Sequence, residues 1–184
     1  ATYVERCVID AIKHDITIYA AHTNMDVVAN GVSGRMADKL DLHHRQILQP
    51  EGDPMDGNGF GIIGELQQPV ESMAFLQQVK EIFRCDRLRY TTPHILSIQR
   101  VAVCGGAGAS FFKQALAGQA DIYISGDFKY HDFFLTENRI MIADIGHYES
   151  EQFTKEIFYE ILTKKISKFA VQFSEINTNP IKYL

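Results

Sequence analysis

The sequence lacks any long run of apolar residues. No stretch approaches the roughly 18 consecutive apolar residues of a membrane span, although 46% of the 184 residues are hydrophobic. Positive charge is also scarce: the net charge is −5, and we interpret the one basic group, at residues 164–168, as the solvated end of a helix. These absences argue against a membrane protein and against a nucleic-acid partner, so we expect a soluble protein.

Cysteine is rare as well. Cys7, Cys85 and Cys104 are odd in number, widely spaced and embedded in apolar sequence, which argues against a disulfide framework. Such usage indicates a reducing compartment, so we expect a cytoplasmic protein. Cys104 ends a strand-like run, and we interpret it as a structural thiol rather than a nucleophile.

The best candidate for a boundary is the stretch 50–59, which is dense in Pro, Gly, Asp and Asn and has no periodicity. Before it, a helical pattern at 3–15 leads into a strand-like run at 16–21, and a second helical pattern follows at 32–40. The chain lacks an initiator Met and opens inside the first helical pattern. We therefore expect that a segment before residue 1 is missing.

Short strands and helices alternate after residue 99. Strands are expected at 101–104, 122–125, 140–145 and 168–173, with helices at 110–116, 131–137 and 151–166. This alternation predicts an α/β fold with a mainly parallel sheet that helices cover on both faces. Ligands bind at the carboxyl ends of strands in such sheets, and His22, Gly105, Asp127 and His147 all follow strand ends.

His147 and Glu151 lie four residues apart, directly after the apolar run 140–145. On a helix their Cβ atoms would lie about 5–6 Å apart, close enough to share a divalent ion. The alternative is a simple His–Glu pair at a helix terminus. His22 and Asp26 repeat the same interval after another strand-like run, and imidazoles with carboxylates from separate strands suit Zn, Fe or Mn.

Asp127 and His131 form a third acid–histidine pair at the same interval. In one interpretation this pair supports a metal site by holding a ligand imidazole in its tautomer. In the other, Asp127 caps the following helix while His131 lies at the surface. The sequence leaves both interpretations open.

Gly105, Gly106 and Gly108 form a Gly-rich turn between an expected strand and an expected helix. The turn matches only part of the dinucleotide fingerprint, because Phe111 takes the place of the third glycine. Its backbone N–H groups are candidates for binding a phosphate or another anion, with Lys129 as an added positive charge. The alternative is a tight turn without a ligand.

Five segments, taken in order, resemble the signature segments of the NGG-interacting factor three-like family, whose bacterial members are often labelled GTP cyclohydrolase type-two homologues. The segments are residues 19–26, 61–66, 101–108, 125–131 and 144–151. The resemblance covers nearly the whole chain, and the shared order of five motifs argues against chance agreement.

The resemblance implies two Rossmann-like α/β lobes with mainly parallel sheets covered by helices, and a homohexamer shaped as a toroid. Residues 1–49 would be the remainder of an incomplete first lobe. Residues 50–59 would be a linker or the insertion point of an extra domain. Residues 60–184 would form the second lobe, whose C-terminal part closes a metal site between the lobes.

Residue by residue, the resemblance matches Asp26, His147 and Glu151 to the family's metal ligands, and His22 and His131 to residues that line the site. The family's other two ligands are adjacent histidines upstream of the helix that opens this chain, and they have no counterpart here. Two divalent ions, Zn, Fe or Mn, are expected in the intact family site. We expect this chain to bind metal weakly or at one position.

Two functions are compatible with these features. The first is a metal-dependent hydrolase, resembling GTP cyclohydrolase, that acts on a nucleotide or another small molecule, with the ions lowering the pKa of a bridging water. The second is a non-catalytic metal-binding scaffold or regulator, because the sequence contains ligands but no clear general acid, nucleophile or substrate clamp. No catalytic residue is assigned, and the sequence leaves open whether the protein is an enzyme.

Overall fold

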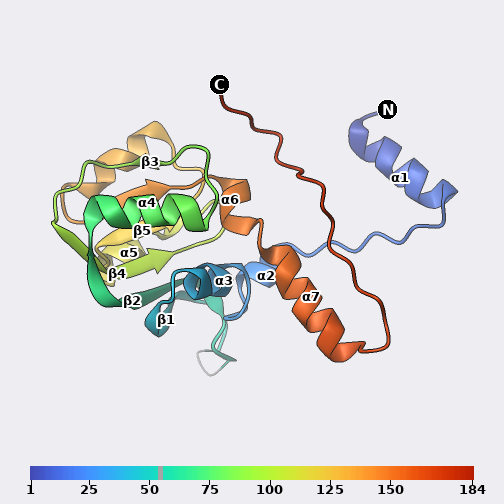
Figure 1. The fold of residues 1–184 in the computed structure, drawn as a ribbon, viewed down its shortest axis with the longest axis horizontal. Coiled ribbons are helices and arrows are strands. Elements are labelled where there is room, and N and C mark those ends of the chain that lie inside the picture. The colour runs from blue at the N-terminus through green and yellow to red at the C-terminus, as the bar shows by residue number, and fades with distance from the viewer. Residues whose placement is uncertain (54–55) are drawn as a thin grey trace.

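A six-stranded mixed sheet forms the centre of the described part of the molecule, in the order β1-β2-β4-β5-β6-β3 (Figure 1). The computed structural model describes residues 1–53 and 56–184. The strands are β1 (His43–Pro50), β2 (Gly59–Glu71), β3 (Arg89–Tyr90), β4 (Ser97–Val103), β5 (Ile122–Ser125) and β6 (Met141–Asp144). The central strands β4, β5 and β6 are parallel, whereas the outer strands pair antiparallel. The α/β class predicted from the sequence is confirmed.

Helices cover both faces of this sheet. The helical elements are α1 (Tyr3–Lys13), α2 (Thr23–Asp26), α3 (Val32–Lys39), α4 (Ser72–Ile82), the 3₁₀ helix η2 (Ala109–Phe111), α5 (Phe112–Ala117), the 3₁₀ helix η3 (Tyr130–Thr136), α6 (His147–Glu151) and α7 (Thr154–Lys165). Side chains of α3 and α4 pack in one apolar cluster, and side chains of η2, α5 and η3 pack in the other. The order of layers is therefore helix, sheet, helix.

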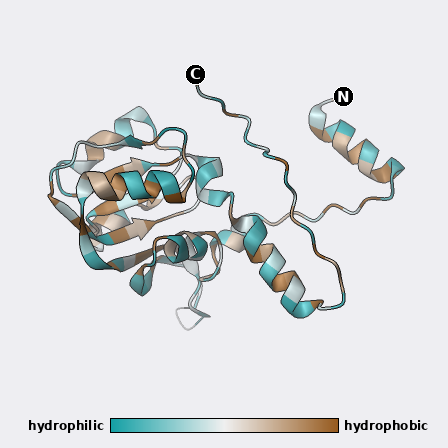
Figure 2. Cartoon of the chain, viewed as in Figure 1, coloured by the Kyte–Doolittle hydropathy of each residue, from teal (hydrophilic) through white to brown (hydrophobic). Residues whose placement is uncertain are grey.

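The alternation of side chains along β5 explains why the chain folds around this strand. Ile122 and Ile124 pack in the cluster under α3 and α4, whereas Tyr123 between them packs in the cluster under α5. All three are fully buried, because successive residues of a strand point to opposite faces and both faces are covered. In Figure 2 the central strands carry hydrophobic colouring.

The predicted boundary at 50–59 connects two adjacent strands. β1 and β2 pair antiparallel up to Pro50 opposite Gly59, so strands from both sides of the boundary belong to the same sheet. Residues 54 and 55 of this stretch lie outside the described residues. The division into two lobes stays a prediction.

Two predicted strands, at 16–21 and 168–173, are not strands in the structure. Residues 16–21 have no regular secondary structure, and 168–173 begins with a turn at Lys168. Neither segment has a ladder with a neighbouring strand, and an isolated strand leaves its backbone groups unpaired. Side chains instead attach both segments to α7: the Tyr19 ring meets Phe158 edge-on at 6.5 Å, and Phe173 stacks on Tyr159 at 4.5 Å. These predictions were wrong because periodicity does not supply a pairing partner.

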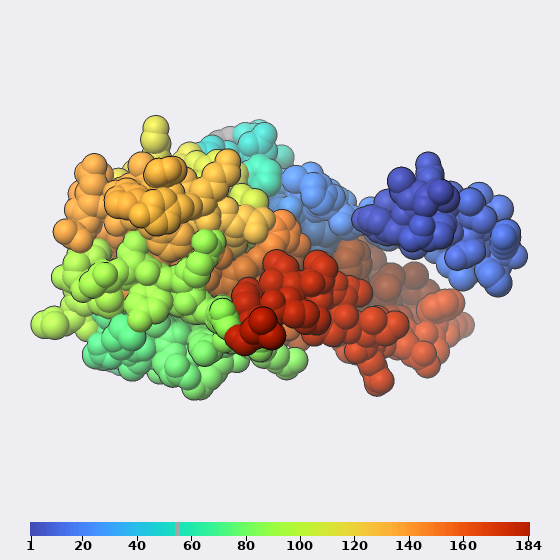
Figure 3. All heavy atoms as spheres, turned by 90° about the horizontal axis from the view of Figure 1, so that it is seen from above, coloured from blue at the N-terminus to red at the C-terminus, as the bar shows by residue number. Residues whose placement is uncertain are grey.

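Helix α1 projects away from the sheet in two perpendicular views (Figures 1 and 3). A capping box formed by Thr2 and Glu5 begins the helix, and its large apolar side chains, among them Tyr3 and Ile12, are exposed, whereas Ala11 is buried. None of the described helices is both long enough and apolar enough to cross a membrane.

The three cysteines are free thiols in different environments. Cys7 is exposed on α1, whereas Cys85 and Cys104 are buried. Burial raises the pKa of the Cys85 thiol to about 12 and that of the Cys104 thiol to about 11. Both buried thiols therefore have the low reactivity of structural cysteines at neutral pH.

Candidate metal centre

Helix α6 presents His147 and Glu151 on one face. The helix follows β6 after a turn at Gly146, which has φ +93°, a conformation that favours glycine. Buried Asp144 fixes this turn by accepting a 3.0 Å hydrogen bond from the Gly146 N–H. One helical turn then separates the two site residues, and His147 Nε2 lies 3.4 Å from Glu151 Oε1.

Asp127 holds the other nitrogen of the same imidazole. It follows β5, and its Oδ2 lies 2.7 Å from His147 Nδ1. When Nδ1 donates its proton to Asp127, the lone pair of Nε2 faces Glu151, which is the tautomer that a metal-binding histidine requires. Asp127 thus pairs with His147, and not with His131 as the spacing of four residues had suggested. The ring of His131 instead lies beside Tyr130 and Phe134.

Asp26 approaches from the other end of the chain, at the end of α2. Burial raises the pKa of Asp26, and the charges of His22 and His147 partly counter this rise. Burial likewise raises the pKa of Glu151. The charge of Asp26 raises this pKa further, whereas the charge of His147 lowers it. These mutual influences place Asp26, His22, His147 and Glu151 in one electrostatic cluster.

The cluster holds more acid than base. Burial would lower the pKa of His147, but its hydrogen bond to Asp127 and the charges of Glu151, Asp127 and Asp26 raise it. Three carboxylates therefore act on this one imidazole. A cation would relieve the cost of keeping half-buried Asp26 and Glu151 ionised together.

The donor set fits a divalent ion in its chemistry but not yet in its spacing. Carboxylate oxygens and an imidazole nitrogen are the ligands that Zn, Fe and Mn accept. Across residues 1–53 and 56–184, however, no three His, Cys, Asp or Glu side chains are already grouped closely enough to hold an ion. The two pairs around His147 are formed, whereas Asp26 is linked to them only through its charge, and its role as a ligand stays a prediction.

The Gly-rich turn lies against the cluster, because a Cβ added at Gly106 would meet Glu151 Oε1 and the His147 ring. The N–H groups of Gly105, Gly106 and Gly108 already donate to serine hydroxyls, at 3.2, 2.8 and 3.0 Å. A phosphate would have to compete with these bonds for the three glycine N–H groups, and anion binding at this turn stays a prediction. Lys129 is exposed, and its backbone N–H donates to Asp132.

The accepting hydroxyls belong to Ser33, Ser150 and Ser125, none of which was predicted from the sequence. Ser150 also donates to the His147 carbonyl at 2.7 Å, which ties the turn to α6. Ser125 also donates to the Gly106 carbonyl at 3.1 Å, which ties the turn to β5. A serine at a strand or helix end is too common a feature to have indicated this network.

The chain matches one family and several of its relatives. Residues 1–180 match the family described as Duf34/NIF3 (NGG1p interacting factor 3). A Streptococcus pneumoniae relative, named GTP cyclohydrolase 1 type 2 homolog, is 37% identical over 184 residues, which cover 96% of this chain and 68% of the relative. A Lactococcus lactis relative of the same name is 32% identical, and the match covers 96% of this chain and 67% of the relative.

Solved structures share the fold. A hypothetical protein of Staphylococcus aureus matches with a TM-score of 0.86 at 24% identity, over 96% of this chain and 72% of that one. A Bacillus cereus protein related to NIF3 matches with a TM-score of 0.83 at 20% identity, over 97% of this chain and 76% of that one. Likeness at this level of identity concerns the fold alone.

Proposed function

The chain belongs to the Duf34/NIF3 family, and from that premise we propose that it binds a divalent metal ion through Asp26, His147 and Glu151 and acts as a metal-dependent hydrolase. The observation that carries this proposal is the state of His147: Asp127 engages one ring nitrogen, and the other faces Glu151. This is the arrangement by which a carboxylate, itself not a ligand, orients a metal-binding histidine.

The protein's own residues have distinct tasks in this proposal. Asp26, His147 and Glu151 would hold the ion, which leaves the remaining coordination positions to water or substrate. Asp127 keeps the imidazole in the binding tautomer. Ser150 fixes α6 to the Gly106 turn. A bound ion would act as a Lewis acid: it would polarise a substrate and lower the pKa of a water molecule bound to it toward neutrality.

The substrate class and the assembly are also part of the proposal. The relatives' name, GTP cyclohydrolase 1 type 2 homolog, supports a nucleotide or another small molecule as substrate. The intact family site would hold two ions of Zn, Fe or Mn, and this chain would bind metal weakly or at one position. The homohexamer and the cytoplasmic location are proposed on the same premise, and sedimentation of the purified chain tests the hexamer.

Metal binding can be tested with matched amide variants. Isothermal titration with Zn²⁺ and Mn²⁺ should give measurable binding to the wild-type chain and clear losses in Asp26→Asn and Glu151→Gln. Asp10→Asn, on α1 and outside the cluster, should bind as the wild type does. Equal affinity in all four proteins would sink the proposed ligand set, and two tightly bound ions per chain would contradict single occupancy.

The second candidate is a non-catalytic metal-binding scaffold or regulator. One observation favours it: in the described part of the chain, the close partners of the His147 ring are the carboxylates of Asp127 and Glu151. The ring is therefore not paired with a serine or cysteine nucleophile. A screen of nucleotides with the metal-loaded protein decides between the two. Turnover that disappears in Glu151→Gln supports the hydrolase, whereas no turnover together with metal-dependent partner binding supports the scaffold.

A further inference from the structure

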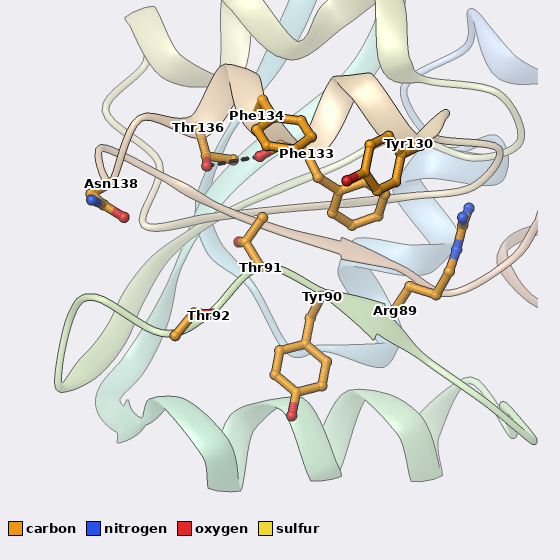
Figure 4. Close-up of a pocket in the computed structure, with 9 residues that line it drawn as sticks. All are labelled: Arg89, Tyr90, Thr91, Thr92, Tyr130, Phe133, Phe134, Thr136 and Asn138. Carbon is orange, nitrogen blue, oxygen red and sulfur yellow. Dashed lines mark hydrogen bonds between the residues drawn. The ribbon is translucent and has the colours of Figure 1, made fainter.

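A cavity of about 480 Å³ lies between β3 and η3, on a different set of residues from the metal cluster. Figure 4 shows its two sides: Thr91 and Thr92 face the rings of η3, while the ring of neighbouring Tyr90 points away from η3. Its full lining is Arg89, Tyr90, Thr91, Thr92, Tyr130, Phe133, Phe134, Thr136 and Asn138. Its volume falls within the range of about 300–1,000 Å³ that is usual for small-molecule sites.

Three aromatic rings of η3 line one side of the cavity, and the middle one, Phe133, is held in place by its neighbours. Phe133 is braced between the buried Phe128 ring, 6.0 Å away between centroids, and the guanidinium of Arg89, 5.4 Å from its centroid. Tyr130 and Phe134 flank it and meet edge-on at 5.3 Å. These two side chains are 71% and 63% exposed, so their ring faces are open to a ligand.

The charge of the cavity is compensated from within the protein. Arg89 is the charged residue of the lining, and it forms an ion pair with the carboxylate of Asp144, which is 4% exposed. The Asp144 carboxylate balances the charge of the guanidinium, which also donates to the Phe128 carbonyl at 2.7 Å. The lining therefore carries no unbalanced charge, and this favours an uncharged ligand.

Polar groups gather at the other end of the cavity. Thr91 accepts a 3.0 Å hydrogen bond from the Ile142 N–H, and Thr136 donates a 3.1 Å bond to the Phe133 carbonyl, so both hydroxyls have fixed positions. The Asn138 side chain has no partner among residues 1–53 and 56–184, and its amide can both donate and accept. The lining thus combines ring faces with donors and acceptors of neutral character.

We propose that this cavity binds an uncharged planar heterocycle with the size and chemistry of a nucleobase. Its ring would stack against Tyr130 and Phe134, and its edge would bond with Asn138 and the threonine hydroxyls. Aromatic faces combined with neutral polar groups match such a ring better than an aliphatic or an anionic ligand. This binding needs no metal ion and is independent of the proposed hydrolase.

The absence of tryptophan from the chain permits a direct test. The fluorescent nucleoside 2-aminopurine riboside, excited at wavelengths where tyrosine does not absorb, reports stacking as quenching without a protein background. Saturable quenching is expected with the wild-type chain. Tyr130→Ala and Phe134→Ala should each weaken binding roughly 5- to 150-fold, the cost of removing one stacked ring.

Two control variants remove equally exposed rings elsewhere. Tyr3→Ala and Phe169→Ala alter side chains that are 72% and 70% exposed and lie outside the cavity, so they should leave the affinity unchanged. Circular dichroism of every variant confirms that it is folded. Adenosine should displace the probe, and ribose should not.

Three results would overturn the inference. The first is no saturable quenching up to the solubility limit of the nucleoside. The second is quenching that Tyr130→Ala and Phe134→Ala leave unchanged, or that ribose abolishes as well as adenosine does. The third is a wild-type chain that binds no probe and forms an oligomer, together with dissociation of that oligomer in Tyr130→Ala and Phe134→Ala. The cavity would then be a contact between subunits.

Discussion

Replacing Gly106 with alanine tests whether the Gly-rich turn supports the metal cluster. Gly106 has φ +63°, and a Cβ added there would lie 2.5 Å from Glu151 Oε1 and 3.3 Å from His147 Cε1. The first distance is shorter than contacts in real structures, so the carboxylate of Glu151 must move. The chain contains a matched control in Gly57, which has the same φ of +63° and no atom within 4 Å of an added Cβ.

The backbone cost should be similar in the two variants. An L-residue in the left-handed conformation costs about 1–2 kcal/mol, and the lower entropy of the unfolded chain offsets about 0.4–1 kcal/mol of it. The net loss of unfolding free energy is therefore about 1 kcal/mol for Gly106→Ala and at most that for Gly57→Ala. For a chain of this size, thermal denaturation should show a fall of roughly 2–4 °C in Tm.

The two variants should differ in metal binding. Displacing Glu151 from His147 disturbs two proposed ligands at once, and changes to the groups that position metal ligands typically reduce affinity by roughly 10–100-fold. Titration calorimetry with Zn²⁺ should show this loss in Gly106→Ala and wild-type affinity in Gly57→Ala. The NMR signals of the His147 ring should shift in the first variant alone. Equal affinities and unshifted ring signals would refute the argument that this turn packs against the site.

Other predictions follow from the same network. Ser150→Ala leaves a buried turn amide unpaired and should cost about 1–3 kcal/mol in urea denaturation, whereas a loss below about 0.5 kcal/mol would show that the hydroxyl is dispensable. Asp127→Asn should lower the pKa of His147, as measured by NMR titration. Because that pKa is raised in the folded state, the stabilisation exists below the unfolded value of about 6.5 and is lost as pH rises through the folded value. The stability gap between wild type and Asp127→Asn should therefore be larger at pH ~5.5 than at pH ~8, and a constant gap would contradict the pairing. With a thiol reagent on the folded chain, Cys7 alone should react, and rapid labelling of all three cysteines would contradict the burial of the other two.

Local patterns were sufficient for the centre of the fold. The strands around 101–104, 122–125 and 140–145 are short apolar runs between helical segments, and each forms a strand of the parallel core. Such runs are diagnostic because a central parallel strand is buried on both faces. The expected strands at 16–21 and 168–173 have similar composition, but a strand also needs a neighbour to pair with, and sequence periodicity contains no information about that neighbour.

The same limit applies to the site, where one interval has three different outcomes. His147 and Glu151 both lie in α6, so four residues correspond to one helical turn and the side chains meet. His22 precedes α2 as its N-cap, and its backbone N–H donates to Asn24, so the pair with Asp26 is not set by a helical face.

Asp127 has φ +59° and lies before η3, so the chain turns between it and His131, and its carboxylate reaches His147 from a neighbouring strand instead. A spacing of four residues predicts a shared face only where both residues lie within the same helix. The contacts that join elements distant in sequence depend on how the sheet orders its strands. Asp127 and His147 meet because β5 and β6 are adjacent and parallel, so that their carboxyl ends reach the same edge of the sheet.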